Sequence, residues 1–185
     1  MTKRRFKSND PERRQWQNPE EILAGAGLRP GMTFIDIGCG EGFFSIPAAH
    51  MVGENGHVYA FDINEEAIRY LGTQVKEEHL DNLTTRTGSG EDTLLCEGCA
   101  DMVFFGIDLH DFNNPEKVLM NARMMLKPEG VLVDLDWKDQ PMEFGPPLEK
   151  RFSLFKATNM IQSAGFQIIS THEAGPYHYL VIAGL

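Results

Sequence analysis

The sequence predicts a doubly wound α/β fold, in which helices cover both faces of a largely parallel sheet. An apolar, β-branched run at residues 33–37 stops at three alternating glycines, Gly38, Gly40 and Gly42, as expected for a buried strand that enters a tight turn. The mostly apolar stretch at residues 43–52 then reads as a helix packed on that strand. Strand-like and helix-like segments alternate along the rest of the chain, which favours a parallel sheet with crossover helices.

Further elements follow from capping residues and apolar periodicity. Asn18 and Pro19 begin a helix that Gly27 ends, and Asn64 caps a helix reaching about residue 79. Strands are expected at residues 57–61, 83–87, 101–106, 131–136, 166–170 and 177–183, and later helices at 115–126 and 149–164.

The second strand ends in Asp62, which is followed by Ile63. Nucleoside-binding α/β folds place a carboxylate about 20 residues beyond the glycine loop, where it accepts hydrogen bonds from ribose hydroxyls. The pattern therefore predicts a nucleoside-type ligand at the glycine loop.

The acidic residue before the glycine loop helps to decide which nucleoside could bind there. Asp36 lies two residues before the first glycine, where it would repel a pyrophosphate in a partly dry pocket. The third glycine also comes one residue earlier than in the dinucleotide fingerprint, and Phe43 follows it. A cationic nucleoside without phosphate, such as S-adenosylmethionine, suits this loop better.

At this point the chain resembles the class I S-adenosylmethionine-dependent methyltransferases, in particular the small-molecule group that includes the ubiquinone/menaquinone-type enzymes. The resemblance spans roughly residues 20 to 137. The matching segments are Asp36 to Gly42, Asp62, Ser89-Gly90-Glu91-Asp92, Ala100-Asp101-Met102-Val103 and Leu126-Lys127-Pro128-Glu129-Gly130.

The resemblance implies a Rossmann-like sheet of seven strands, with the last strand antiparallel between strands five and six. It implies a methyltransferase domain at residues 18–185, preceded by a basic N-terminal arm at 1–17. S-adenosyl-L-methionine would be the cofactor. The residues expected to bind it are Asp36, Gly38, Cys39, Gly40, Gly42, Asp62, Ile63, Ser89, Gly90 and Glu91.

The Ser89-Gly90 pair departs from the pattern of the resembled family. Many members have Asp-Ala where this chain has Ser89-Gly90, and that aspartate accepts a hydrogen bond from the adenine amino group. A serine hydroxyl can also accept this bond. Glu91 and Asp92 could equally be surface acids.

The methyl acceptor is expected beyond the fourth strand, because ligands of open parallel sheets bind at the carboxyl ends of the strands. Asp108 and His110 lie there and are the candidate catalytic residues. His110 could deprotonate an acceptor, or it could hold the loop by a hydrogen bond. Asp134 and Asp136 with Asp108 raise the alternative of a magnesium site, but strand alternation limits it, so no metal is expected.

Cys96 and Cys99 form a single CxxC motif, which could be a redox pair or half of a zinc site. A structural zinc site needs two further ligands, and no second CxxC or HxxxH is present. Two ordinary thiols are therefore the favoured interpretation. The alternative is a methyltransferase that holds a metalloid substrate on Cys96, Cys99 and Cys39.

Charge is unevenly distributed along the 185 residues, which carry a formal net charge of −10. The first 14 residues hold six basic and two acidic side chains, so the arm is basic and the body acidic. An acidic body disfavours nucleic-acid binding, although the arm could contact an anion. Trp16 is expected to pack on the body, and the composition predicts a cytoplasmic chain without a membrane partner.

Besides the metalloid alternative, the sequence leaves two functions open. The first is methyl transfer to a small-molecule acceptor by in-line displacement, for which the polar residues Asp108, His110, Asp136 and Trp137 converge at the expected acceptor position. The second is a regulatory protein that binds the cofactor without turnover.

Overall fold

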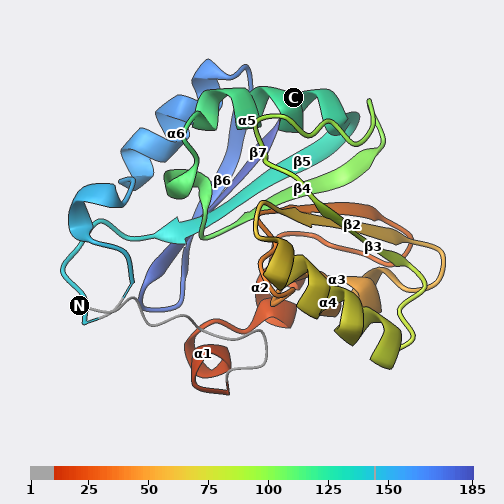
Figure 1. The fold of residues 1–185 in the computed structure, drawn as a ribbon. Coiled ribbons are helices and arrows are strands. Elements are labelled where there is room, and N and C mark those ends of the chain that lie inside the picture. Colours follow the sequence, from red (N-terminus) through yellow and green to blue (C-terminus); the bar gives the residue numbers. More distant parts are fainter. Residues whose placement is uncertain (1–10, 144) are drawn as a thin grey trace.

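The computed structural model describes residues 11–143 and 145–185, and its centre is one seven-stranded sheet (Figure 1). The strand order is β3-β2-β1-β4-β5-β7-β6. Neighbouring strands pair in parallel, except that β7 runs antiparallel to both β5 and β6. The predicted doubly wound fold with an antiparallel last strand between strands five and six is confirmed.

The strands lie close to their predicted positions. They are β1 (Thr33–Ile37), β2 (His57–Asp62), β3 (Leu83–Thr87), β4 (Ala100–Gly106), β5 (Leu126–Trp137), β6 (Gln167–Ala174) and β7 (His178–Gly184). The helices are α1 (Pro11–Trp16), α2 (Pro19–Gly25), α3 (Ser45–Val52), α4 (Glu65–Glu77), α5 (Pro115–Met125) and α6 (Leu154–Ser163). Short 3-10 turns cover Leu109–Asp111 and Leu148–Lys150.

The sheet separates two apolar layers. Buried side chains of α2, α3 and α4 pack with Phe34 of β1 and Phe104 of β4 on one face. Those of α5 and α6 pack with Ile35 and Phe105 on the other face (Figure 1). Successive residues of β1 and β4 thus serve opposite layers, as the two-residue period of a strand requires.

Capping residues set the helix starts as the sequence indicates. The Asn18 side chain accepts from the Glu21 N–H at 3.3 Å, and Asn64 accepts from the N–H groups of Glu66 and Ala67. These bonds satisfy amide donors that have no partner within the first helical turn.

Three elements differ from the sequence prediction. Residues 11–16 form the short helix α1, although the arm shows no apolar periodicity. Strand β5 already begins at Leu126, which pairs with Ala100, and a register shift absorbs residues 127–130 before Val131 pairs with Met102. Helix α6 begins later than predicted because Ser153 caps it.

None of the helices in the described residues is long and apolar enough to cross a membrane.

The packing of α4 on the sheet gives a direct stability test. Leu71 of α4 is fully buried, so Leu71→Ala should lower the free energy of unfolding by about 3 kcal/mol through lost apolar burial and a residual cavity. Urea unfolding followed by circular dichroism measures this. Lys76→Ala, at an exposed position of the same helix, is the control and should change stability little; equal losses for both variants would contradict this packing.

Candidate functional site

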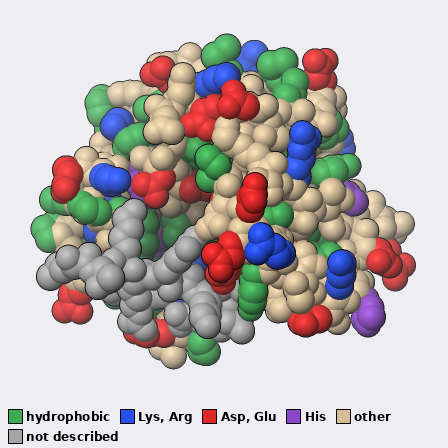
Figure 2. Space-filling model, viewed as in Figure 1, with side chains coloured by type: hydrophobic (Ala, Val, Ile, Leu, Met, Phe, Trp, Pro, Cys, Tyr) green, Lys and Arg blue, Asp and Glu red, His purple; other side chains and the backbone are tan. Residues whose placement is uncertain are grey.

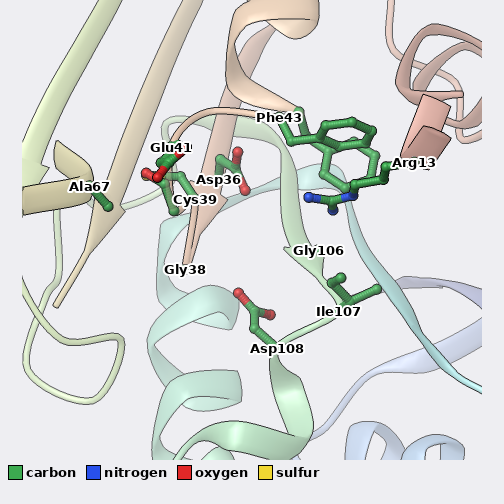
Figure 3. Close-up of a pocket in the computed structure, with 12 residues that line it drawn as sticks. Arg13, Asp36, Gly38, Cys39, Glu41, Phe43, Ala67, Gly106, Ile107 and Asp108 are labelled. Atoms are coloured by element: carbon green, nitrogen blue, oxygen red, sulfur yellow. The ribbon is translucent and has the colours of Figure 1, made fainter. Parts of the chain in front are cut away.

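A cavity of about 210 Å³ opens beside the glycine loop, at the carboxyl ends of β1 and β4 (Figure 3). The carboxylates of Asp36 and Asp108 face the same space from these two strands. The lining residues are Arg13, Asp36, Gly38, Cys39, Gly40, Glu41, Phe43, Phe44, Ala67, Gly106, Ile107 and Asp108.

Asp62 holds the glycine loop in place from the end of β2. Its carboxylate accepts from the Gly40 N–H at 2.9 Å and from the Asn64 N–H at 2.7 Å. The backbone carbonyl of Phe61 accepts from the N–H groups of Gly38 and Cys39. The predicted loop and its predicted carboxylate are therefore in direct contact, and each carboxylate oxygen retains room for a further donor.

Gly38 and Asp108 approach one another closely. A Cβ on Gly38, whose φ is +74°, would collide with the Asp108 carboxylate. On the Asp108 side, Ile107 adopts a φ of +66°, which is rare for a β-branched residue. The bond from the Ile107 N–H to the Leu135 carbonyl, 2.7 Å, holds this strained residue at the end of β4.

Asp36 is a buried carboxylate with one partner. Ser45, at the start of α3, donates its hydroxyl hydrogen to one carboxylate oxygen, whereas the other has no partner. Burial raises the pKa of Asp36 to about 7, and the negative charge of Asp62 acts in the same direction. Ser45 and Arg13 oppose this rise.

Asp108 is more isolated still. Both of its carboxylate oxygens are buried and lack a hydrogen-bond partner. Burial, followed by repulsion from Asp36, raises its pKa well above the ordinary value of 3.8. Because an unpaired buried charge is costly, two such groups at one cavity create a strong preference for a positively charged ligand.

Cys39 is the third predicted loop residue at the cavity. Its thiol is buried and lies 3.6 Å from the Gly40 carbonyl. Burial and the neighbouring acids raise the pKa of this thiol, so it remains neutral and fills the loop.

The loop after β3 lies apart from the cavity lining. Asn121 of α5 donates to the backbone carbonyls of Gly90 and Glu91, both at 2.9 Å. The Glu91 carboxylate accepts from the Asn113 N–H at 3.1 Å, so it helps to hold the turn before α5. Ser89 bonds with Asp92, and Ile63 is 74% exposed at the end of β2.

His110 is buried against β5 and does not line the cavity. Its Nδ1 lies 2.8 Å from Asp136 Oδ1, and its side chain is only 2% exposed. Asp136 also accepts from the Trp137 N–H. The structure thus brings together two predicted residues that are distant in sequence, and their bond ties the turn after Asp108 to β5.

The three acids of the magnesium alternative are not grouped as ligands. Asp134 and Asp136 face the α5 and α6 side of the sheet, as strand alternation requires, and Asp136 is bonded to His110. Among the described residues, no three His, Cys, Asp or Glu side chains are arranged to hold a metal ion.

The CxxC motif corrects one expectation. The structure joins Cys96 and Cys99 in a disulfide, so the favoured interpretation of two separate thiols was wrong. The pair precedes β4, whereas Cys39 follows β1, and these two strands are parallel. The three cysteines therefore lie at opposite ends of the sheet, and the metalloid site they might have formed is not assembled.

Helix α1 contributes residues that the sequence did not assign to the site. The Arg13 guanidinium lies 3.6 Å from the centre of the Phe43 ring. Trp16, one turn later, stacks on His178 and confirms the predicted packing on the body. Only the basic charge of the arm hinted that it could reach an anion.

This geometry defines a class of protein. A doubly wound sheet with a glycine loop after β1 and a carboxylate after β2 is a nucleoside-binding α/β architecture. The profile of the family described as "Methyltransferase domain" matches residues 28–171. The chain belongs to this methyltransferase-domain family.

Individual relatives agree with this membership. A crystal structure of an S-adenosylmethionine-dependent methyltransferase from Aquifex aeolicus superimposes with a TM-score of 0.90 at 31% identity, covering 97% of this chain and 98% of that one. The nocamycin O-methyltransferase of Saccharothrix syringae is 32% identical over 55% of this chain and 36% of its own length.

A third relative is the ubiquinone/menaquinone biosynthesis C-methyltransferase UbiE of Shewanella sp. (strain ANA-3), 26% identical over 84% of this chain. The match covers 60% of that protein. The chain thus spans less than two thirds of the length of these two curated relatives.

The raised pKa of Asp36 predicts a pH dependence of stability. The Asp36 carboxyl is harder to ionise in the folded chain than in the unfolded chain. Its contribution to the free energy of unfolding is therefore full below the pKa of the unfolded chain, and it is lost as the pH rises through about 7. When the pH is raised from about 5 to about 8, the free energy of unfolding should therefore fall less in Asp36→Asn than in the wild type. The difference between the two decreases should be on the order of 2 kcal/mol. Urea unfolding at both pH values measures this, and parallel losses would contradict the raised pKa.

Proposed function

We propose that the chain is an S-adenosylmethionine-dependent methyltransferase that acts on a small-molecule acceptor. The single observation that carries this proposal is the pair of buried carboxylates, Asp36 and Asp108, whose unpartnered oxygens border the cavity at the glycine loop. Family membership and the relatives named above support the same reaction class.

The cofactor fits this charge pattern. S-adenosylmethionine, when bound, supplies a methyl group already activated by a positively charged sulfur. Its methionine end also carries an ammonium group, which can donate hydrogen bonds to the Asp36 and Asp108 oxygens that lack donors. Gly38 has no Cβ to fill the space next to Asp108.

The adenosine end would lie toward β2 and β3. Asp62 keeps acceptor capacity for the ribose hydroxyls while it holds Gly40. Ile63 exposes an apolar surface at the same strand end, where it can cover the adenine ring. Ser89, Gly90 and Glu91 would border the adenine through their loop, which Asn121 anchors.

The chain's task is then to position the two reactants and exclude water, because the leaving group is already activated. The acceptor would approach over the carboxyl ends of β4 and β5. The formal net charge of −10 favours a small molecule over a nucleic acid. On the face shown in Figure 2, the basic side chains of the described residues are scattered singly.

We assign His110 a positioning role. Its bond to Asp136 fixes the turn that begins one residue after Asp108, and therefore the direction of the Asp108 carboxylate. A role as general base for the acceptor stays a prediction. The geometry favours positioning, because the ring is buried and lies outside the cavity lining.

The test is transfer of labelled methyl groups from S-adenosylmethionine into a cell extract, separated into small molecules and macromolecules. We expect label in a small product with the wild type, and at least a tenfold lower rate with Asp108→Asn, because a charged hydrogen bond of about 1.5–3 kcal/mol would be lost. Asp81→Asn, an exposed acid outside the site, should behave as wild type.

Tight binding of S-adenosylhomocysteine without label in any fraction would contradict turnover and favour the regulatory alternative. Label confined to nucleic acid or protein would contradict the small-molecule acceptor.

A further inference from the structure

Arg13 stands out among the residues that border the cavity. It is the only Lys, Arg or His side chain in the lining that the described residues provide. It is also buried, at 8% exposure, which is unusual for an arginine. The guanidinium therefore lies beside a carboxylate-lined cavity with little exposure to water.

The guanidinium is held in a defined orientation. Its Cζ atom lies 3.6 Å from the centre of the Phe43 ring, and the two side chains border the cavity together (Figure 3). Its Nε donates to Gln17 Oε1 at 2.7 Å. The cation–π contact and this bond together hold the planar fork at the border of the cavity. Such a fork can recognise a carboxylate through two hydrogen bonds.

Helix α1 itself is anchored on the body. Trp16 stacks on His178 with ring centres 5.5 Å apart and an interplanar angle of 13°. A Cβ on Gly175 would meet the Trp16 carbonyl oxygen at 2.8 Å, so the turn before β7 packs tightly on the end of α1. The position of Arg13 is thus fixed from a second side.

The charges of the lining mirror those of one end of the proposed cofactor. Asp36 and Asp108 are acidic and Arg13 is basic. The methionine end of S-adenosylmethionine carries two positive groups, the sulfonium and the ammonium, and one negative group, the carboxylate. Two acids alone would repel that carboxylate, so a cation is required beside them.

We infer that Arg13 binds the α-carboxylate of the cofactor's methionine end, and that α1 thereby closes this end of the site. The inference rests on the proposed function in that it needs the methionine end in this cavity. It adds a specificity residue: Arg13 distinguishes amino-acid-bearing adenosyl compounds from adenosyl compounds without a carboxylate.

The experiment compares two ligands by calorimetry. The first is S-adenosylhomocysteine, and the second is its decarboxylated analogue, which keeps the adenosine, the sulfur and the ammonium. In the wild type, removal of the carboxylate should weaken binding by about tenfold or more, the effect expected of a charge-assisted bond. In Arg13→Gln, the preference for the carboxylate-bearing ligand should be lost, because the shared contact is removed, and the decarboxylated analogue should bind at least as tightly, because the two acids then repel the carboxylate.

Two further variants sharpen the comparison. Arg14→Gln removes the same charge from the next position of α1, where the side chain is 41% exposed and pairs with Glu20 at 3.0 Å; it should retain the wild-type preference. Arg13→Lys keeps the charge without the planar fork and should retain part of the preference. Circular dichroism of each variant establishes that it is folded.

Equal binding of the two ligands by the wild type would overturn the inference, and so would an unchanged preference in Arg13→Gln. Either result, with tight S-adenosylhomocysteine binding by the wild type, would leave the proposed cofactor in place. Absence of S-adenosylhomocysteine binding by the wild type would overturn both the inference and the proposed function.

Discussion

The structure depends on one electrostatic constraint, the burial of two carboxylates at the carboxyl edge of the sheet. Asp36 has one hydrogen-bond donor and Asp108 has none. In water each group would be ionised and solvated, whereas here burial raises the pKa of both. Such an arrangement destabilises the isolated protein, and a cationic ligand at the cavity would offset this cost. The free energy that burial of the two carboxylates costs in the unliganded protein is therefore regained when a cationic ligand binds, and it adds to the affinity for that ligand.

Several local features hold the acids in this position. Ile107 accepts a left-handed backbone conformation so that the chain can turn at the end of β4, and Gly38 leaves the space that the Asp108 carboxylate needs. The bond between His110 and Asp136 fixes the following turn on β5. On the other side, Asp62 holds Gly40 so that the loop stays open toward the cavity. The left-handed Ile107 is strained, whereas the bonds of His110 and Asp62 stabilise the loops on either side. Together these features hold the two acids at the cavity, with Ser45 as the one hydrogen-bond donor that the described residues provide to either acid.

Much of the fold could be predicted because it depends on local sequence. Strand and helix periods, the caps Asn18 and Asn64 and the glycine loop act within a few residues, so their elements appeared where expected. The missed features depend on contacts between distant segments: the pairing of Leu126 with Ala100, the bond from Ser45 to Asp36, and the approach of Arg13 to Phe43. Asp36 and Asp62 were predictable because both belong to a recognisable sequence motif. The burial of His110 was not, because it depends on Asp136, which lies 26 residues away in β5.

The most direct test of this account measures protons. If Asp36 is largely protonated in the free protein, a cationic ligand must displace that proton when it binds. Titration of S-adenosylhomocysteine just below the Asp36 pKa of about 7, in two buffers of different ionisation enthalpy, should give different heats that correspond to proton release. The release should diminish in Asp36→Asn. Equal heats in both buffers, with tight binding, would show that the carboxylates are already ionised and would contradict the account.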